Sequence, residues 1–292
     1  MNLSFYSYDP NSLEKHGKSF YWASFFLPNK NKDAASELYS ICRYFDDLAD
    51  EAPTDQSEKL KSEFEQICNN VEHPINKFFK SNNIPIQILG DLIQGLIRDQ
   101  KLVRIQTEKD LIEYSYQVAG TVGLMMQPLI LIKDKNANKH AVDLGIAMQL
   151  TNIARDIYED AIMNRVYLPK EWLKEISIEH LKSDTADEIQ TQMNVILKRL
   201  IDLSEIYYQN GFSGMRYIPI KTRLAIFFAA KIYRAIGIKI KVNNYQYSNK
   251  RVYLNKLNKL WITIKSLPEF ILLKMIYRTY TPIRESFQNE NL

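Results

Sequence analysis

Residues 145–160 read GIAMQLTNIARDIYED. Its apolar residues recur every three or four positions, the spacing of one face of an α-helix, and they are Ile146, Leu150, Ile153 and Ile157. A second line with the same spacing is polar and consists of Gln149, Asn152, Asp156 and Asp160. The stretch therefore predicts an amphipathic helix that presents two aspartates one turn apart.

Residues 34–50, AASELYSICRYFDDLAD, have the same design. The apolar face of this predicted helix consists of Leu38, Ile41, Phe45 and Leu48. A narrow polar line lies away from that face and consists of Tyr39, Arg43, Asp46 and Asp50. Residues four apart on a helix have Cβ atoms roughly 5–6 Å apart, so Asp46 and Asp50 form a second acidic pair. Asp47 lies one residue off this line, and we expect it to contact residues of the site rather than a ligand directly.

Each D-x-x-x-D pair has two interpretations. A solvated helix face often carries acidic residues, and one such motif alone favours that interpretation. Here both pairs lie within apolar sequence, each shares its line with Tyr, Arg, Asn or Gln, and the chain contains two of them. These three features favour a functional site.

A functional site requires both polar lines to face one cavity, so that four carboxylates converge. Two unit charges 6 Å apart repel by roughly 3 kcal/mol at an effective dielectric constant of 20, so such a cluster needs cations. Oxygen ligands without histidine or cysteine favour Mg²⁺, which bridges carboxylates to the phosphates of a substrate. The residue types therefore predict diphosphate binding and departure, on the condition that the two lines face each other.

The composition argues against several other classes of protein. The net charge of +4 is far below that of a nucleic-acid-binding domain, so no nucleic-acid partner is expected. The two cysteines belong to no C-x-x-C pair and the four histidines are scattered, which argues against disulfides and zinc. The N-terminus lacks the pattern of a secretory signal and no apolar run is long enough to cross a bilayer, so we expect a cytoplasmic protein.

The chain contains only 9 glycines and 10 prolines, the residues that most often interrupt helices, and no linker divides it. Long segments have the helical period, which predicts a single all-α domain over residues 1–292 with its core at about 13–260. The tail at 261–292 is apolar and basic and includes WITIKSLPEFILLKMIYRTY (261–280). This tail predicts either a packed terminal helix or peripheral contact with the inner face of a membrane.

Five segments, taken in order, resemble the squalene and phytoene synthase family. They are HGKSFYWASFFLP (16–28), LYSICRYFDDLAD (38–50), YSYQVAGTVGLMM (114–126), LGIAMQLTNIARDIYEDAIMNRVYLPKEWL (144–173) and the stretch from Tyr233 to Arg251. The block QLTNIARDIYEDA followed by NRVYLP looks most like bacterial phytoene synthases. The resemblance implies the isoprenoid synthase fold, in which helices surround a deep central cavity and the two aspartate motifs face each other.

Carried over position by position, the resemblance also implies a site. Its ligands for two or three Mg²⁺ ions, with Mn²⁺ as an alternative, are Asp46, Asp50, Asn152, Asp156 and Asp160. The implied catalytic residues are these four aspartates together with Arg43 and Tyr39. The implied substrate-binding residues are Lys18, Ser19, Phe20, Tyr39, Arg43, Tyr114, Gln149, Arg155, Arg165, Tyr233 and Arg251. Segment 118–126 is implied to line the isoprenoid channels.

Three features of the sequence leave alternatives open. The turn before Arg251 is one residue longer than the family pattern, so Lys250 is an alternative basic residue. Asn164 stands where many relatives have a glycine, next to Arg165. Gly120 and Gly123 leave room either for an isoprenoid tail or for close packing of helices.

The activity that the resemblance implies is the Mg²⁺-dependent head-to-head condensation of two geranylgeranyl diphosphates. It passes through a cyclopropylcarbinyl diphosphate to phytoene, in carotenoid biosynthesis, and we expect no need for NADPH. One alternative is a head-to-head synthase for C15 donors that makes dehydrosqualene, squalene or hydroxysqualene. Another is a terpene cyclase or a chain elongator. An alternative of a different class is a non-enzymatic assembly factor, which we expect to lack the four aspartates that this chain retains.

Overall fold

A computed structural model describes residues 6–50, 55–182 and 187–272, and it confirms the predicted all-α fold. Within these ranges there is no strand, only an isolated bridge between Arg104 and Val166. The helices are α1 (Ser12–His16), α2 (Lys18–Ser24), α3 (Asn29–Ala49), α4 (Ser57–Asn69), α5 (Pro74–Ser81), α6 (Ile86–Asp99), α7 (Glu108–Ser115), the π-helix η1 (Tyr116–Gly120), α8 (Thr121–Leu129), α9 (Ala137–Ile162), α10 (Lys170–Leu173), α11 (Ile178–Leu181), α12 (Asp187–Ser213), the 3-10 helix η2 (Gly214–Tyr217), α13 (Ile220–Val242) and α14 (Lys256–Leu272).

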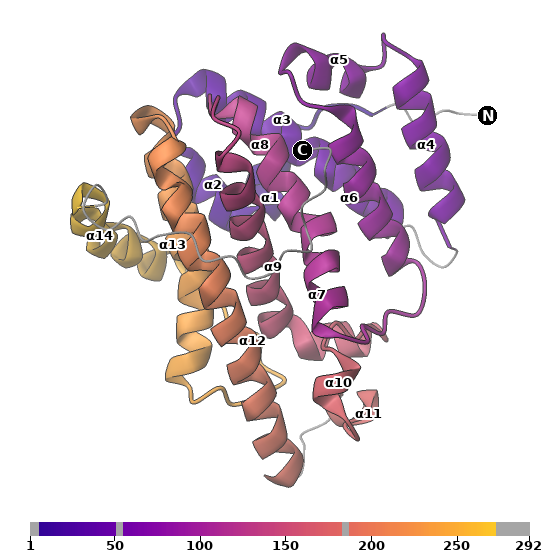
Figure 1. Ribbon diagram of the computed structural model, residues 1–292, viewed down its shortest axis with the longest axis vertical. Helices are drawn as coiled ribbons and strands as arrows, with labels where there is room; N and C mark the ends of the chain where they lie inside the picture. The colour runs from indigo at the N-terminus through magenta and orange to yellow at the C-terminus, as the bar shows by residue number, and fades with distance from the viewer. Residues whose placement is uncertain (1–5, 51–54, 183–186, 273–292) are drawn as a thin grey trace.

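Helix α9 is the centre of the fold. It packs against α12 and α13 on one side and against α7, η1 and α8 on the other (Figure 1). The apolar line predicted for it is buried, with Ile146, Leu150, Ile153 and Ile157 each at most 5% exposed. The apolar line predicted for α3 is also buried, at Leu38, Ile41, Phe45 and Leu48. Both amphipathic predictions are therefore confirmed, and burial of these faces fixes the direction in which each polar line points.

Two glycines allow the central helices to approach each other closely. A Cβ atom on Gly123 of α8 would lie 2.3 Å from the carbonyl oxygen of Ala141 in α9. A Cβ atom on Gly145 of α9 would lie 2.3 Å from the carbonyl oxygen of Ala119 in η1. Both distances are far below contact with backbone atoms that cannot move aside, so close packing accounts for these glycines.

Helix α14 lies on the outer side of α13, at the edge of the molecule (Figure 1). Glu269 of α14 accepts two hydrogen bonds from the half-buried Lys231 of α13, at 2.5 and 2.6 Å. The indole of Trp22 in α2 donates to the Thr263 hydroxyl at 3.2 Å. The predicted boundary between core and tail at 260/261 therefore falls inside a packed helix, and the part of the tail at 273–292 lies outside the described residues. No helix in the described ranges is long and apolar enough to cross a bilayer.

Candidate functional site

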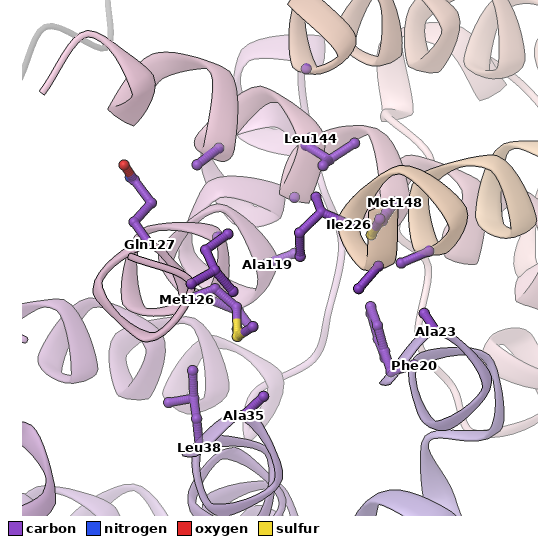
Figure 2. A pocket seen from close by; sticks show the side chains of 18 of the residues that line it. Phe20, Ala23, Ala35, Leu38, Ala119, Met126, Gln127, Leu144, Met148 and Ile226 are labelled. Atoms are coloured by element: carbon purple, nitrogen blue, oxygen red, sulfur yellow. The ribbon is translucent and has the colours of Figure 1, made fainter. Parts of the chain in front are cut away.

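A cavity of about 380 Å³ lies among the central helices. Side chains from separate helices, among them Phe20, Leu38, Met126 and Leu144, point into a common space (Figure 2). The helices that contribute lining residues include α2, α3, η1, α8, α9 and α13. The segment predicted to line the channels contributes Val118, Ala119, Val122, Gly123 and Met126. Most of the wall is apolar, so the cavity suits a hydrocarbon tail.

One group of polar lining residues comes from the aspartate motifs and their surroundings. They include Tyr39 and Asp46 on α3, Gln149 and Asn152 on α9, and Tyr233 on α13. Tyr39 lies within electrostatic range of both Asp46 and Tyr233, and Tyr233 lies within range of Asp156. The acidic end of α3 and the acidic end of α9 are thus brought to the same end of the cavity.

Both acidic pairs lie in the last two turns of a helix. Helix α3 ends at Ala49 with Asp50 as its C-cap, and α9 ends at Ile162, two residues after Asp160. The C-terminus of a helix carries negative partial charge from its unpaired carbonyl groups, which disfavours carboxylates there. The arrangement therefore concentrates negative potential at this end of the cavity and makes it a place for cations.

Asp46 and Asp160 are the carboxylates of the motifs that no arginine neutralises directly. No hydrogen bond or salt bridge to either side chain is found among the described residues. Burial raises the pKa of Asp46 to about 7; Arg43 opposes this, while Asp50, Asp47 and Asp99 add to it. Burial, followed by the charge of Asp156, also raises the pKa of Asp160 to about 7. These raised pKa values show that the fold holds both groups in a place that is unfavourable for a negative charge without a cation.

Asp50 and Asp156 instead have arginine partners. Arg165 lies 3.5 Å from Asp50. Arg251 donates to both oxygens of Asp156, at 2.8 and 3.1 Å. Arg155 also bonds Asp156, at 2.7 and 2.5 Å, although it is not on the same line of α9, because its long side chain reaches sideways to its neighbour. The structure thus gathers three of the predicted arginines at the acidic end of the cavity.

Arg251 rather than Lys250 occupies the position beside Asp156. Among the described residues Lys250 makes one hydrogen bond to a side chain, in which its backbone amide donates to the Ser248 hydroxyl at 3.0 Å. Arg43, on the opposite wall, forms a salt bridge with Asp47 one turn away, and its Nε atom is buried without a hydrogen-bond partner. Asp47 therefore orients Arg43, as expected for a supporting residue.

Sequence analysis missed Asp99 and Tyr167. Asp99, the last residue of α6, accepts hydrogen bonds from the Tyr114 hydroxyl at 2.8 Å and the Tyr167 hydroxyl at 3.1 Å. The two tyrosine rings stack with centroids 4.9 Å apart. Burial raises the pKa of Asp99 to about 6, although both hydroxyls and Arg165 oppose this rise. Its charge acts on both Asp46 and Asp160, so Asp99 is a fifth carboxylate between the two motifs.

The remaining predicted substrate contacts divide into two groups. Phe20 and Tyr233 line the cavity and stack on each other with centroids 4.9 Å apart. Burial raises the pKa of Tyr39, which also lines the cavity, to about 12, so its hydroxyl stays protonated. Lys18 and Ser19 do not line the cavity; Lys18 is exposed at the start of α2.

The residues fit a divalent cation that is shared with a substrate. In the described part of the chain no three His, Cys, Asp or Glu side chains converge closely enough to hold a metal ion by themselves. Mg²⁺ is commonly bound by one or two carboxylates together with phosphate oxygens and water, so a closed protein cage is not required. The carbonyl oxygen of the Asn152 side chain is buried without any hydrogen-bond donor. This free acceptor and the unpaired Asp46 and Asp160 have the donor chemistry that Mg²⁺ prefers.

Comparison with known proteins agrees with this geometry. The family model described as Squalene/phytoene synthase matches residues 13–258. Phytoene synthase from Rhodobacter capsulatus is 34% identical over 85% of this chain and 76% of its own length. The 15-cis-phytoene synthase of Enterobacter agglomerans is 32% identical over 78% of this chain and 83% of its own length.

Solved structures give the same fold. A dehydrosqualene synthase crystallised with a ligand is 30% identical and superimposes with a TM-score of 0.78, over 90% of this chain and 94% of its own. A squalene synthase from Alicyclobacillus acidocaldarius, 20% identical with a TM-score of 0.72 over 82% of this chain and 93% of its own, supports the fold alone. The chain therefore belongs to the squalene/phytoene synthase family of all-α prenyl transferases and has their isoprenoid synthase fold.

Proposed function

We propose that this protein joins two molecules of geranylgeranyl diphosphate head to head to give phytoene. The observation that carries this proposal is the junction of an apolar cavity with an end that holds five carboxylates and several arginines. A prenyl diphosphate has the same two-part character, with a hydrocarbon tail and an anionic head. The similarity to named phytoene synthases over most of the chain supports the C20 donor and a role in carotenoid biosynthesis.

The arginines at the acidic end serve the departure of diphosphate. Breaking the bond between C1 and its oxygen leaves negative charge on the diphosphate and positive charge on the tail. Arg43, Arg165 and Arg251 present planar, permanently charged groups that bind phosphate oxygens in pairs. Such stabilisation of a developing charge is usually the largest contribution to catalysis. When bound to the carboxylates and Asn152, Mg²⁺ would further draw negative charge from the leaving group.

The cavity wall serves the allylic cation that remains. Phe20 and Tyr233 stack beside the polar end, where an aromatic face can stabilise a positive charge. The apolar lining excludes water, which would otherwise convert the cation to an alcohol. A cation that is sheltered in this way reacts with the double bond of the second donor, and loss of a proton closes a cyclopropylcarbinyl diphosphate. Departure of the second diphosphate and opening of the ring give a second cation, which loses another proton, with no reductant required.

The second candidate is head-to-head condensation of C15 donors. The observation in its favour is the likeness, at 30% identity, to a solved dehydrosqualene synthase. Donor length separates the two candidates, because the chemistry at the acidic end is the same for both.

Product analysis tests the proposal. Purified protein is incubated with Mg²⁺ and either geranylgeranyl or farnesyl diphosphate, without NADPH, and the hydrocarbons are identified by mass spectrometry. We expect a C40 product with three conjugated double bonds from the C20 donor. A C30 product from farnesyl diphosphate alone, or only hydrolysed alcohols from both donors, would contradict the proposed function.

We also propose peripheral contact with an anionic membrane surface through α14. Exposed apolar side chains follow one another along this helix, at Leu257, Leu260, Trp261, Ile264, Leu267 and Ile271. Lys256 and Lys265 are exposed on the same helix and suit acidic headgroups. In flotation with anionic liposomes we expect the protein to rise with the vesicles and the double variant Trp261→Asp/Ile264→Asp to stay behind. Val195→Asp is the matched control, since Val195 is equally exposed on α12. Unchanged flotation of the double variant, or no flotation of the native protein, would exclude this surface.

A further inference from the structure

We infer that α9 sets the length of the donor tail, with Ala141 at the depth of the cavity that only a C20 tail reaches. This inference rests on the proposed function, because it concerns the tail of the same substrate. It goes further by naming the residues that decide between the two donor lengths.

One face of α9 follows the cavity for most of the length of the helix. From the acidic end inward, this face presents Asn152, Met148, Leu144, Ala141 and Ala137, all of which line the cavity. Figure 2 shows Met148 and Leu144 one turn apart on this wall. The metal-ligand candidates Asp156 and Asp160 continue the same face beyond Asn152. Distance along this helix therefore estimates how deep into the cavity a tail reaches when its diphosphate is held at the acidic end.

The rise of an α-helix converts residue number into depth. At 1.5 Å per residue, Ala141 lies about 16 Å and Ala137 about 22 Å from the level of Asn152. With carbon–carbon bonds of about 1.5 Å, an extended chain advances by roughly 1.25 Å per bond. The fifteen bonds of the geranylgeranyl main chain then span about 19 Å, and the eleven bonds of the farnesyl main chain about 14 Å. A farnesyl tail therefore ends before the level of Ala141, whereas a geranylgeranyl tail passes Ala141 and ends before Ala137.

Alanines on two helices leave room at the deep end of the cavity, beside larger lining residues such as Ile130 and Met215. They are Ala141 and Ala137 on α9 and Ala225 on α13. The start of α13 is held there because the Thr222 hydroxyl donates to the carbonyl oxygen of Ile130 at 3.0 Å. The small alanine side chains leave space that a tail can fill. A larger side chain on α9 would occupy that space without touching the acidic end.

A polar group marks the limit of this deep end. Gln127, at the end of α8, lines the cavity and is only 6% exposed. Its side-chain amide has no hydrogen-bond partner among the described residues. Covering such an amide with hydrocarbon costs free energy, because its hydrogen bonds to water are lost without replacement. A tail longer than C20 is thus disfavoured, and the usable length matches the C20 donor.

Variants with a larger side chain at Ala141 test this inference. Ala141→Leu and Ala141→Met fill the deep end, and two variants are made in case one does not fold. Ala229→Leu is the matched control, because Ala229 lines the cavity on α13 one turn from Tyr233, where both tails pass. For each protein, kcat/KM is measured with C20 and C15 diphosphates. Binding of unreactive C20 and C15 thiolodiphosphates is measured as well, and circular dichroism checks the fold.

We expect the C20-to-C15 ratio, in kcat/KM and in affinity, to fall by about tenfold or more in Ala141→Leu or Ala141→Met, because overpacking affects only the longer tail. In Ala229→Leu the ratio should stay within about threefold of the native value, since both tails meet the added bulk. Folded deep-end variants with an unchanged ratio would overturn the inference while leaving the proposed function intact. If the native protein bound and converted neither donor, the proposed function would fail and the inference with it.

Discussion

Asp46 and Asp160 differ from the other motif aspartates because no arginine among the described residues lies within salt-bridge distance of either carboxylate. Both are partly buried beside further negative charges, and burial raises the pKa of each to about 7. A desolvated carboxylate without a partner destabilises a fold, so its presence points to a function. The function we propose is cation binding at the place where diphosphate departs.

The raised pKa values predict how stability depends on pH without metal. An unfolded aspartate has a pKa near 3.9, so between about pH 4 and pH 7 the folded protein binds more protons than the unfolded chain. The free energy of unfolding must then fall as the pH rises through this range. We expect the melting temperature of the metal-free protein to fall from pH 4.5 to 7.5. The slope should be shallower in Asp46→Asn, whose amide does not titrate, and equal slopes in the two proteins would refute this assignment of pKa values.

Asp99 is the residue whose role is best tested by an isosteric change. Asp99→Asn keeps the shape of the side chain but removes the charge that Tyr114, Tyr167 and Arg165 share. We expect kcat to fall by about tenfold or more, since a hydrogen bond to a charged group contributes roughly 1.5–3 kcal/mol.

A matched control for Asp99→Asn lies on the same helix. Asp91 of α6 accepts a hydrogen bond from the Tyr116 hydroxyl at 3.0 Å but does not lie between the motifs. Asp91→Asn should keep kcat within about twofold of the native value. Equal effects of the two substitutions on kcat would mean that Asp99 acts only through stability.

Asn164 shows why one departure from the family pattern is tolerated. Its φ angle is 60°, in the left-handed region that favours glycine and also admits asparagine. Its backbone and side-chain oxygens accept from Arg104, at 2.8 and 2.9 Å. The turn therefore keeps its conformation and still places Arg165 beside Asp50.

At the scale of the element, hydrophobic period and helix termini account for what could be predicted. The polar and apolar lines on α3 and α9 could be predicted because the residues on the buried face of a helix recur with a fixed period. That period also determines which residues lie on the opposite face. The role of Asp99 could not be predicted, because this residue lies at the end of α6 without a second aspartate one turn away on the same helix. Its role comes from tyrosines on other elements, and no local spacing encodes that contact.

The π-helix η1 is another feature that sequence period does not reveal. It interrupts the helix between Tyr116 and Gly120, where a wider turn shifts the register of the following residues. That shift lies in the segment that lines the cavity beside α9. A prediction from the hydrophobic period assumes 3.6 residues per turn throughout, so it predicts a helix here but not the change in register.

Because η1 packs closely against α9, we expect an added methyl group at Gly145 to destabilise the fold. Gly145→Ala places a methyl group 2.3 Å from a backbone carbonyl oxygen, so the two elements must separate. We expect a loss of about 2 kcal/mol or more in the free energy of unfolding, the usual cost of overpacking. Gly237→Ala in α13 is the control, because its added Cβ lies 3.3 Å from a flexible Ile201 side chain. Chemical denaturation should show this variant unchanged or slightly stabilised, and a similar loss in both variants would refute the packing argument.

At the scale of the whole molecule, the residue pattern predicted the fold class and the side of each helix that carries the acidic residues, but not that the two acidic sides face each other. The family resemblance implied that they do. In the structure Tyr39, Tyr233 and Asp99 lie within electrostatic range of the acidic residues and so link α3 to α9. The depth of the cavity was not predictable, because it depends on alanines contributed by separate elements, namely Ala137 and Ala141 on α9 and Ala225 on α13. A single sequence does not show which of its small residues meet in space.

The central claim is that the two acidic turns act together on one diphosphate, and single isosteric variants test it most directly. Turnover of geranylgeranyl diphosphate with Mg²⁺ is measured for Asp46→Asn on α3 and Asp160→Asn on α9, with the exposed Asp33→Asn on α3 as control. We expect each motif variant to lose at least about a hundredfold in kcat, the usual loss when transition-state charge stabilisation is removed. Helical circular dichroism should be unchanged in both, and the control should keep its activity. Near-native turnover in either motif variant would contradict the account.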